Sequence, residues 1–529
     1  MSSDAHYSAS RRDPAYKWKV ISAVMVGTFM AALNASIVNV STPDIMASFG
    51  VSLDDIKWVV TSYMIGFAVL MPLTSFLRGR MGHTRLFTWS LVVFLAGSLL
   101  CGMAWNFPVL IFARILQALG GGAMTPTGMS LINDVFPAQD KGRGLGYFSM
   151  GVIVAPAIGP TLGGYLTQVF GWRSIFFVNL PFGIAAIVLS LVFLKSDVPH
   201  KDTHRPFDFW GFFFLSLFMV AFLLGVSNGQ HEGWSSHYVF TCWILSIVGF
   251  ACFLLVEKQM KDRVVELDLF KNSVFTICFL VSAVRSVALF GSIFLLPLFL
   301  QNLMGFDEIT TGLILLPGSV LMAALMVPSG KLGDRIGPRL LAIFGVLILA
   351  YFMWMYRTLD VDTSTWNVIL PMLVRGFGIA LLMNPIMAAA LNAVPRRLAG
   401  QASSLLSLSQ QVAGSIGIAI LSTVMTNRTL YHLNVLGSGM DASSSVMGHS
   451  IALLRQYALD MGYSHQAAVQ VANALALRNA SRAAQVRGFD DAFLCGMIII
   501  ATALIPAFFL PGKPVHQVPM DPAEIVAAE

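Results

Sequence analysis

Three arginines lie inside long apolar stretches of this sequence, where an unpaired positive charge is costly. Arg114 lies in LIFARILQALGGG, Arg285 in VSAVRSVALFGS and Arg375 in LVRGFG. Charged side chains within a membrane are functional by default and face a cavity or a partner. Two roles are open for each arginine: a cation beside a functional cavity, or a structural tie between helices.

No acidic residue accompanies these arginines inside the apolar stretches. The nearest carboxylates lie close to the ends of the stretches, and they are Asp44, Asp54, Asp55, Asp134, Asp208, Glu257, Asp490 and Asp491. Neutral polar side chains do occur inside, and we expect them to line a cavity because polar groups that face lipid are costly. They are Asn34, Asn39, Tyr63, Gln117, Asn384 and Gln410.

Bulky side chains in the same stretches suit a lipophilic ligand, although most of them are expected to be ordinary core. Tyr147, Met150 and Phe290 are three such candidates. No nucleophile, base and orienting group converge, and no phosphate-binding loop or metal-ligand spacing occurs. The sequence therefore predicts neither an enzyme nor a cofactor or metal site.

The composition explains why these residues must sit on membrane helices. Of 529 residues, 56% are hydrophobic and only 11% are charged, unlike a soluble globular protein. Apolar stretches of about 20 residues can cross a bilayer, and about fourteen of them occur. They begin near positions 18, 56, 86, 108, 144, 174, 209, 238, 273, 309, 339, 367, 400 and 489.

The basic residues sort by loop and so predict the topology. Most of them precede the first stretch or follow an even-numbered one, and the opposite short loops carry few, chiefly Lys57, Arg173 and Arg357. By the positive-inside rule both termini are cytoplasmic, which requires an even number of spans and agrees with fourteen. The net charge of +6 therefore needs no nucleic-acid partner.

Two cytoplasmic loops repeat one another, SFLRGRMGHTR at 75–85 and GKLGDRIGPR at 330–339. In the second copy Asp334 can cap a helix N-terminus and pair with Arg335 or Arg339. The gating residues expected here are Gly330, Asp334, Arg335, Gly337, Arg339 and, in the first copy, Arg80. Two homologous halves are the architecture of a rocking transporter.

The repeat divides the chain into two six-helix bundles with an inserted helix pair. The expected parts are a cytoplasmic tail at 1–17, an N-terminal bundle at 18–195, the pair at 209–257, a C-terminal bundle at 273–511 and a second tail at 512–529.

The fifth stretch, GVIVAPAIGPTLGG, combines glycines with helix-bending prolines. Small residues at four-residue spacing leave one face nearly bare, so another helix can approach closely. This helix is either a moving wall of a pathway or a plain tight-packing helix. Its gating candidates are Gly151, Pro156, Gly159, Pro160, Gly163 and Gly164.

A long segment at 427–487 lies on the outer side and is unusual for a compact transporter. The Ala-rich stretch at 464–486 has the spacing of one helix face, which predicts a helical hairpin or an amphipathic helix. It either rests on the outer leaflet or offers a docking surface to a partner.

These motifs resemble the major facilitator superfamily, whose signature loop the second copy matches. The first copy departs from it, with Ser75 for the leading glycine and Gly79 where an acidic residue is expected. The glycine- and proline-rich fifth stretch and the arginine-containing fourth are similar to the two motifs that mark antiporters. GWRSIFFVNLPFG, LNASIVNVSTP, LLPLFLQ and FDDAF narrow the resemblance to fourteen-helix drug:proton antiporters of the EmrB/QacA type, closest to the EmrB branch.

The resemblance implies a multi-pass efflux protein of the bacterial inner membrane that moves hydrophobic small molecules by alternating access with protons as the coupling ion. It also implies a periplasmic adaptor and an outer-membrane channel as partners, docked on 427–487. A receptor or channel that does not transport is disfavoured by the duplicated loop.

One departure bears on the coupling. The family usually has an aspartate where this chain has Asn34, which cannot carry a proton. One hypothesis is that the cavity prefers lipophilic anions or weak acids, with Arg114, Arg285 or Arg375 as the countercharge and the membrane potential as the drive. The alternative is ordinary proton antiport through a mouth carboxylate such as Asp44 or Asp134.

Overall fold

The computed structural model describes most of the chain. The described residues are 16–136, 140–194, 208–259, 266–357, 359, 363–395, 398–438 and 445–515. Within a few helices some side chains also lie outside the described part, and these include Asn39, Pro156 and Pro160.

Within these ranges the chain is helical, and thirteen helices are long and apolar enough to cross a membrane. A further helix, α7 (Lys141–Phe170), has 30 residues. It packs against α2 of its own half and α13 of the other. With α7, the predicted all-α fold of fourteen membrane helices is matched.

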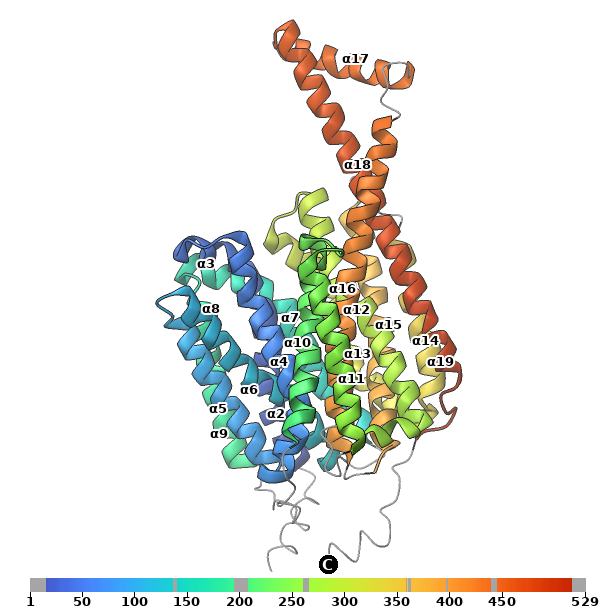
Figure 1. Ribbon diagram of the computed structural model, residues 1–529. Helices are drawn as coiled ribbons and strands as arrows, with labels where there is room; N and C mark the ends of the chain where they lie inside the picture. The colour runs from blue at the N-terminus through green and yellow to red at the C-terminus, as the bar shows by residue number, and fades with distance from the viewer. Residues whose placement is uncertain are drawn as a thin grey trace, which may run out of the picture.

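The first half of the chain forms one bundle. Its long helices are α2 (Tyr16–Val40), α4 (Leu53–Met81), α5 (His83–Gly102), α6 (Phe107–Val135), α7 and α9 (Asn179–Phe193). Two short helices, α3 (Thr42–Phe49) and α8 (Ser174–Phe177), lie at its outer end (Figure 1).

The second half forms the other bundle. Its long helices are α12 (Ser273–Leu298), α13 (Glu308–Ile336), α14 (Pro338–Tyr356), α15 (Thr365–Asn392), α16 (Ala399–Ser438) and α18 (His465–Thr502). Shorter elements are the 3-10 helix η2 (Leu267–Lys271), the π-helix η3 (Phe299–Leu303), α17 (Ser445–Asp460) and α19 (Leu504–Phe508).

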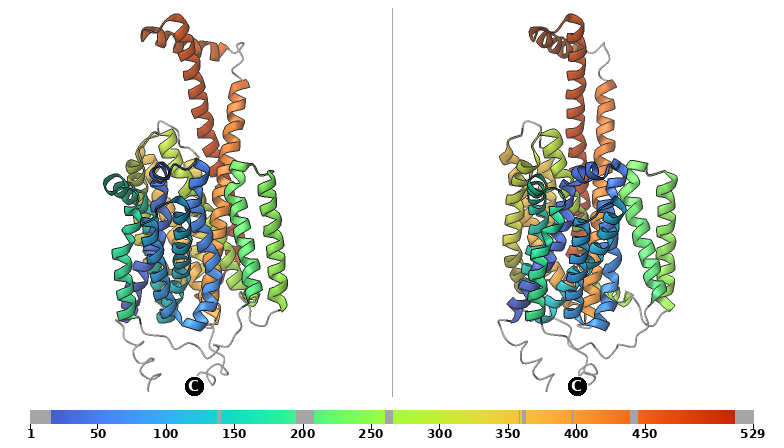
Figure 2. Two further views of the ribbon diagram at one scale, coloured as in Figure 1. Left: turned by 60° about the vertical axis from the view of Figure 1, so that its left-hand side comes forward. Right: turned by 90° about the vertical axis from the view of Figure 1, so that its left-hand side faces the viewer.

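Between the halves, α10 (Phe209–Glu232) and α11 (His237–Gln259) form a helix pair. The pair stands beside the two bundles (Figure 2), and α10 touches α4 of one bundle and α16 of the other. Half of the aromatic side chains on these two helices are exposed, which suits a lipid-facing position because lipid tails are as apolar as the side chains.

The two copies of the repeated loop adopt the same turn. Gly82, between α4 and α5, has φ 79°, and Gly337, between α13 and α14, has φ 85°. Side chains rarely adopt this left-handed region, so each turn depends on a glycine. The described chain begins and ends at the same end of the molecule as these loops (Figure 1), which the positive-inside rule places in the cytoplasm.

The outer segment consists of helices that continue beyond the bundle. α16 has 40 residues and α18 has 38, and each is about 60 Å long at 1.5 Å per residue, twice the hydrocarbon thickness. Their outer ends and α17 project as a helical hairpin (Figure 1). α18 packs on α17, and its Ala468 and Ala472 are fully buried, as the predicted helix face requires.

Candidate functional site

The two bundles approach each other closely where the cytoplasmic ends of α7 and α13 meet. A Cβ on Gly142 would overlap the carbonyl oxygen of Gly330, and a Cβ on Gly330 would overlap that of Gly142. One turn further, a Cβ on Gly146 would lie 2.8 Å from the carbonyl oxygen of Met326. The backbones therefore touch without intervening side chains, as small residues allow.

Asp334 reinforces this contact from the signature loop. Its Oδ1 accepts a hydrogen bond of 3.2 Å from the backbone N–H of Gly142, in the first turn of α7. That turn has unpaired N–H groups and the positive end of the helix dipole, so a carboxylate is favourable there.

The sequence suggested that Asp334 pairs with Arg335 or Arg339. In the structure Asp334 contacts the opposite bundle instead. Arg335 and Arg339 are both exposed at the surface. Arg339 instead donates its Nε–H to the carbonyl oxygen of Leu510 at 2.5 Å. Within the loop, Asp334 therefore serves the contact between bundles.

A second polar contact lies about two turns deeper in the same interface. Ser149 of α7 donates to Oδ1 of Asn384 on α15 at 2.7 Å, and Asn384 donates to the carbonyl oxygen of Met326 at 2.8 Å. Both side chains are fully buried. Asn384 was predicted to line a cavity, but here it is sealed between α7, α13 and α15.

The other interface, where α4 and α6 meet α16, contains hydroxyl hydrogen bonds and the guanidinium of Arg78, which lies against Gly400. The hydroxyls of Thr74 and Ser404 are hydrogen-bonded at 2.9 Å, and Ser403 donates to the carbonyl oxygen of Pro126 at 3.2 Å. Gly79 occupies the position that Asp334 has in the second loop copy, and a Cβ there would meet nothing within 4 Å. No carboxylate from this position reaches α16.

All these contacts join the cytoplasmic halves of the helices. The small-residue face of α7 predicted from the sequence lies further out and turns to its own bundle: Gly151 faces Met25, Gly159 faces Ser36 and Gly163 faces Ile37, all on α2. Gly164 beside them is buried as well. The glycine face therefore joins helices of one bundle, and different glycines join the two bundles.

Gly142, Gly146 and Ser149 are residues of this interface that the sequence reasoning missed. Gly142 and Gly146 are four residues apart in KGRGLGYF, the same small-residue spacing that marks the later part of the helix. That spacing was the available signal.

Arg114 is engaged with neutral groups inside the N-terminal bundle. It is 1% exposed, its Nε–H donates to the carbonyl oxygen of Val59 at 2.9 Å, and its Nη1–H donates to Oε1 of Gln117 at 2.8 Å. The guanidinium carbon lies 4.3 Å from the ring centroid of Tyr63, a favourable cation–π distance.

The same network continues into two further helices. Gln117 donates to Ser98 at 2.9 Å, and Asn179 donates to the same hydroxyl at 3.0 Å. The structure therefore brings three predicted residues, Arg114, Gln117 and Tyr63, into one cluster that ties α4, α5, α6 and α9 together. Asn34 on α2 is fully buried as well.

Arg285 and Arg375 lie in the C-terminal bundle and are less well satisfied. Arg285 is 2% exposed, and within the described part of the chain its hydrogen bonds go only to the hydroxyls of Ser282 and Ser286, at 3.3 and 3.5 Å. Arg375 donates to Ser292 at 3.3 Å. Within the described ranges, none of the ion pairs involves Arg114, Arg285 or Arg375.

The remaining predicted residues are spread over the fold. Tyr147 packs edge-on against Trp18 at 5.1 Å, and Gln410 donates to Ser282 at 3.4 Å. Asp134 lies 3.3 Å from His83 at the cytoplasmic end, whereas Asp44 is exposed in the first turn of α3 at the outer end. Met150 and Phe290 are half-buried, and Arg80 is exposed over the ring of Phe76.

Comparison with known proteins identifies the fold and the family. Residues 24–418 match the family model described as "Major Facilitator Superfamily". This chain belongs to that superfamily. The membership makes it a multi-pass membrane transporter and not an enzyme, as the sequence predicts.

Several bacterial relatives are about one-third identical to this transporter. An uncharacterized MFS-type transporter of Bacillus subtilis, YhcA, is 33% identical over 92% of this chain and 91% of its own length. The multidrug export protein EmrB of Escherichia coli K12 is 32% identical over 78% of this chain and 80% of its own. The multidrug resistance protein Stp of Mycobacterium tuberculosis H37Rv is 33% identical over 76% and 74%.

A solved structure supports the fold alone. The human organic anion transporter MFSD10 superposes with a TM-score of 0.60 over 93% of this chain and 99% of its own, at 13% identity. The resemblance to the EmrB/QacA type is thus confirmed by sequence, and the architecture by both comparisons.

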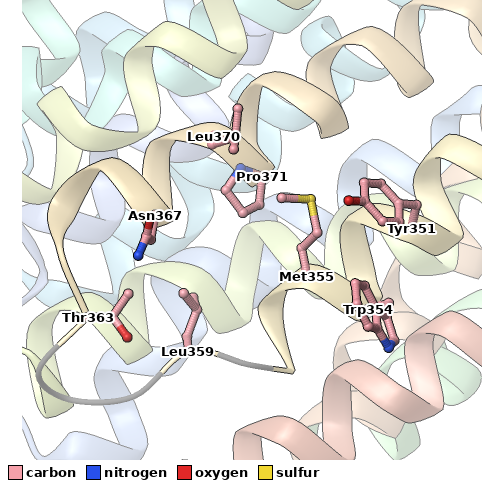
Figure 3. Close-up of a pocket in the computed structure, with 8 residues that line it drawn as sticks. All are labelled: Tyr351, Trp354, Met355, Leu359, Thr363, Asn367, Leu370 and Pro371. Carbon is pink, nitrogen blue, oxygen red and sulfur yellow. The ribbon is translucent and has the colours of Figure 1, made fainter.

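A pocket of about 260 Å³ opens between the outer end of α14 and the start of α15 (Figure 3). Its lining residues are Tyr351, Trp354, Met355, Leu359, Thr363, Asn367, Leu370 and Pro371. Tyr351 and Trp354 are half-exposed there, as aromatic residues at a membrane interface often are. None of the predicted cavity residues lines this pocket, so we do not assign it to the transport pathway.

Proposed function

We propose that this transporter exports hydrophobic small molecules across a bacterial inner membrane by alternating access. The observation that carries the proposal is the cytoplasmic seal, where Gly142 meets Gly330 and Asp334 binds the first turn of α7. A seal at this end, with the described hydrogen bonds between bundles all in the cytoplasmic halves, is what an alternating-access transporter has in its outward-facing state. The names of EmrB and Stp support several drugs as cargo.

The seal must break and reform once in each cycle. When the bundles rock, the hydrogen bonds from Gly142 to Asp334 and from Ser149 to Asn384 are lost together, and the cavity opens to the cytoplasm. The hydrogen bonds lost at this place are few, so substrate contacts in the inward-facing state can offset the free energy of losing them.

Protons are the proposed coupling ion, and the mouth carboxylates are the proposed carriers. Asp134 is half-buried beside His83 at the cytoplasmic end, and Asp44 is exposed at the outer end. A second candidate is supported by the buried arginines without ion-pair partners: export of organic anions driven by potential alone, which gains about 2.3 kcal/mol per charge and 100 mV. Efflux in vesicles under a pH gradient only, or a potential only, separates the two.

The outer hairpin is proposed as the docking site for a periplasmic adaptor that leads to an outer-membrane channel. Large apolar side chains are exposed along it, including Leu453, Tyr457 and Met461. Joining α16 to α18 by a short linker in place of 439–464 tests the proposal. Unchanged adaptor binding and unchanged efflux in the shortened protein would exclude it.

Cross-linking tests the alternating-access proposal directly. In a variant without the five native cysteines, Ser149→Cys and Asn384→Cys are introduced together, and a short thiol cross-linker joins α7 to α15 across the interface. We expect export of a fluorescent lipophilic dye from cells to stop and to recover on reduction of a cleavable linker, while each single variant stays active. Continued export by fully cross-linked protein would refute it.

A further inference from the structure

We propose that Arg285 and the donors around it bind the acidic group of a lipophilic substrate, a carboxylate or an equivalent monovalent oxyanion. The inference rests on the export function proposed above and names its substrate class and binding group.

Arg285 has more hydrogen-bonding capacity than its surroundings use. The side chain is 2% exposed, yet among the described residues its Nε and Nη1 atoms find no hydrogen-bond partner, and only Nη2 reaches the two serine hydroxyls. An unsatisfied donor in an apolar interior is costly, and more so when it is charged. A hydrogen-bond acceptor that enters this place would therefore lower the free energy of the buried cation.

The neighbours of Arg285 are also donors. On α12 the Ser282 hydroxyl lies beside Arg285, whereas the Ser286 hydroxyl already donates to the carbonyl oxygen of Ser282 at 2.8 Å. Gln410 of α16 donates from its amide Nε2 to the Ser282 hydroxyl at 3.4 Å. Hydroxyl, amide and guanidinium N–H groups together match the oxygens of a carboxylate. No ion pair in the described part of the chain supplies that carboxylate from the protein.

Arg114 shows what a structural arginine looks like in this fold. It is as buried as Arg285, but its Nε and Nη1 both donate, at 2.9 and 2.8 Å, to a backbone carbonyl and a glutamine. Burial alone therefore does not leave an arginine unpaired here. The unused N–H donors of Arg285 indicate a ligand-binding side chain, whereas the engaged donors of Arg114 indicate a structural one.

The position of Arg285 suits a substrate site. It lies halfway along α12, twelve residues from the start of the helix and thirteen from its end, and so near the middle of the membrane. Transporters of this architecture place their sites at that depth, between the repeats. Gln410 is only half-buried and belongs to α16, which contacts α4 and α6 of the other bundle.

A second cation lies toward the outer end. Arg375 donates to Ser292, which is seven residues beyond Arg285 on α12 and so about 10 Å further along it. The Nε atom of Arg375 likewise has no hydrogen-bond partner within the ranges that the structure describes. The two arginines provide successive positions for an anion that moves outward.

Equilibrium binding to the purified full-length protein tests the proposal, with 1-naphthoate as the acid and 1-naphthamide as its neutral counterpart. We expect wild type to bind the acid more tightly, and Arg285→Gln to lower the ratio of the two affinities about tenfold, as loss of one charged hydrogen bond predicts. Arg285→Lys keeps the charge and should retain most of the ratio. Ser415→Ala, on α16 outside the site, is the matched control and should leave it unchanged.

Each outcome decides the proposal. A ratio unchanged in Arg285→Gln overturns it, and if that variant does not fold, Gln410→Leu and Ser282→Ala carry the same test. If chloride alone, compared with gluconate, gives the Arg285-dependent binding signal and naphthoate does not, the site holds an inorganic anion and the proposal is wrong. Export of no compound by wild type would instead refute the proposed function, so the two failures are distinguishable.

Discussion

Asp334 Oδ1 lies 3.2 Å from the backbone nitrogen of Gly142, and this hydrogen bond joins the signature loop of one bundle to the first turn of a helix in the other. The two residues are 192 positions apart in the sequence. The loop therefore stabilises the contact between the cytoplasmic ends of the two bundles.

Removing the Asp334 carboxylate should open the cytoplasmic side. Asp334→Ala loses a helix cap, which costs about 0.5–2 kcal/mol and so favours the inward-facing state severalfold. A cysteine at Ser149 should then react faster with a membrane-impermeant maleimide added to inside-out vesicles. Asp334→Asn, which retains an oxygen acceptor without the charge, should lie between wild type and Asp334→Ala. Equal labelling in all three proteins would contradict the assigned role.

Adding the missing carboxylate to the first loop copy should have the opposite effect. Gly79 corresponds to Asp334, and Gly400, the second residue of α16, corresponds to Gly142. Because a Cβ at Gly79 meets nothing within 4 Å, Gly79→Asp is expected to fit and to face the first turn of α16. We expect slower export and slower labelling of the Ser149 cysteine. Gly79→Asn is the uncharged control.

The contact between helix backbones should tolerate no added side chain. Gly142→Ala places a methyl group against the carbonyl oxygen of Gly330 and should separate α7 from α13, so that cytoplasmic labelling rises and export falls. Gly151→Ala, on the same helix, places its methyl group 3.5 Å from Met25, an ordinary contact, and should behave as wild type. Equal loss of activity in both variants would contradict a specific requirement for glycine at the contact between α7 and α13.

The sequence predicted the framework of this site well because local patterns determine it. Apolar length located the membrane helices, and the two related loops indicated turns that Gly82 and Gly337 now show to be alike. Charge distribution oriented the bundle. None of these inferences depends on which helices contact one another.

The partners of the site residues could not be predicted, because they depend on packing between distant segments. The sequence paired Asp334 with neighbouring arginines, whereas its partner is on α7. It placed Asn384 in a cavity, but a polar residue in a membrane helix can equally seal an interface in one state of the cycle. It could not distinguish Arg114 from Arg285, since only contacts from several helices show which guanidinium is satisfied.

Arg114 should affect stability more than selectivity. Arg114→Leu removes the charged donor to the carbonyl of Val59 and to the side chain of Gln117, and a hydrogen bond to a charged group contributes about 1.5–3 kcal/mol. We expect a lower melting temperature in detergent and reduced export of acids and neutral compounds alike. Arg455→Gln, an exposed arginine on α17, is the control and should melt as wild type does. If Arg114→Leu reduced the export of acids alone, Arg114 would have to be assigned to the substrate site instead.

The base of the outer hairpin should be held by one carboxylate. Asp491 of α18 accepts from Arg428 at 2.5 Å and lies 2.9 Å from Nε2 of His432, both on α16, next to the point where Gly488 lets the helices cross closely. Asp491→Asn should loosen this crossing, because the amide keeps one acceptor but loses the charge that attracts Arg428. Hydrogen exchange of the amides in 428–438 and 465–487 should speed up, while exchange in α5 and α6 stays as it was. Exchange that is unchanged throughout would show that apolar packing alone positions the hairpin.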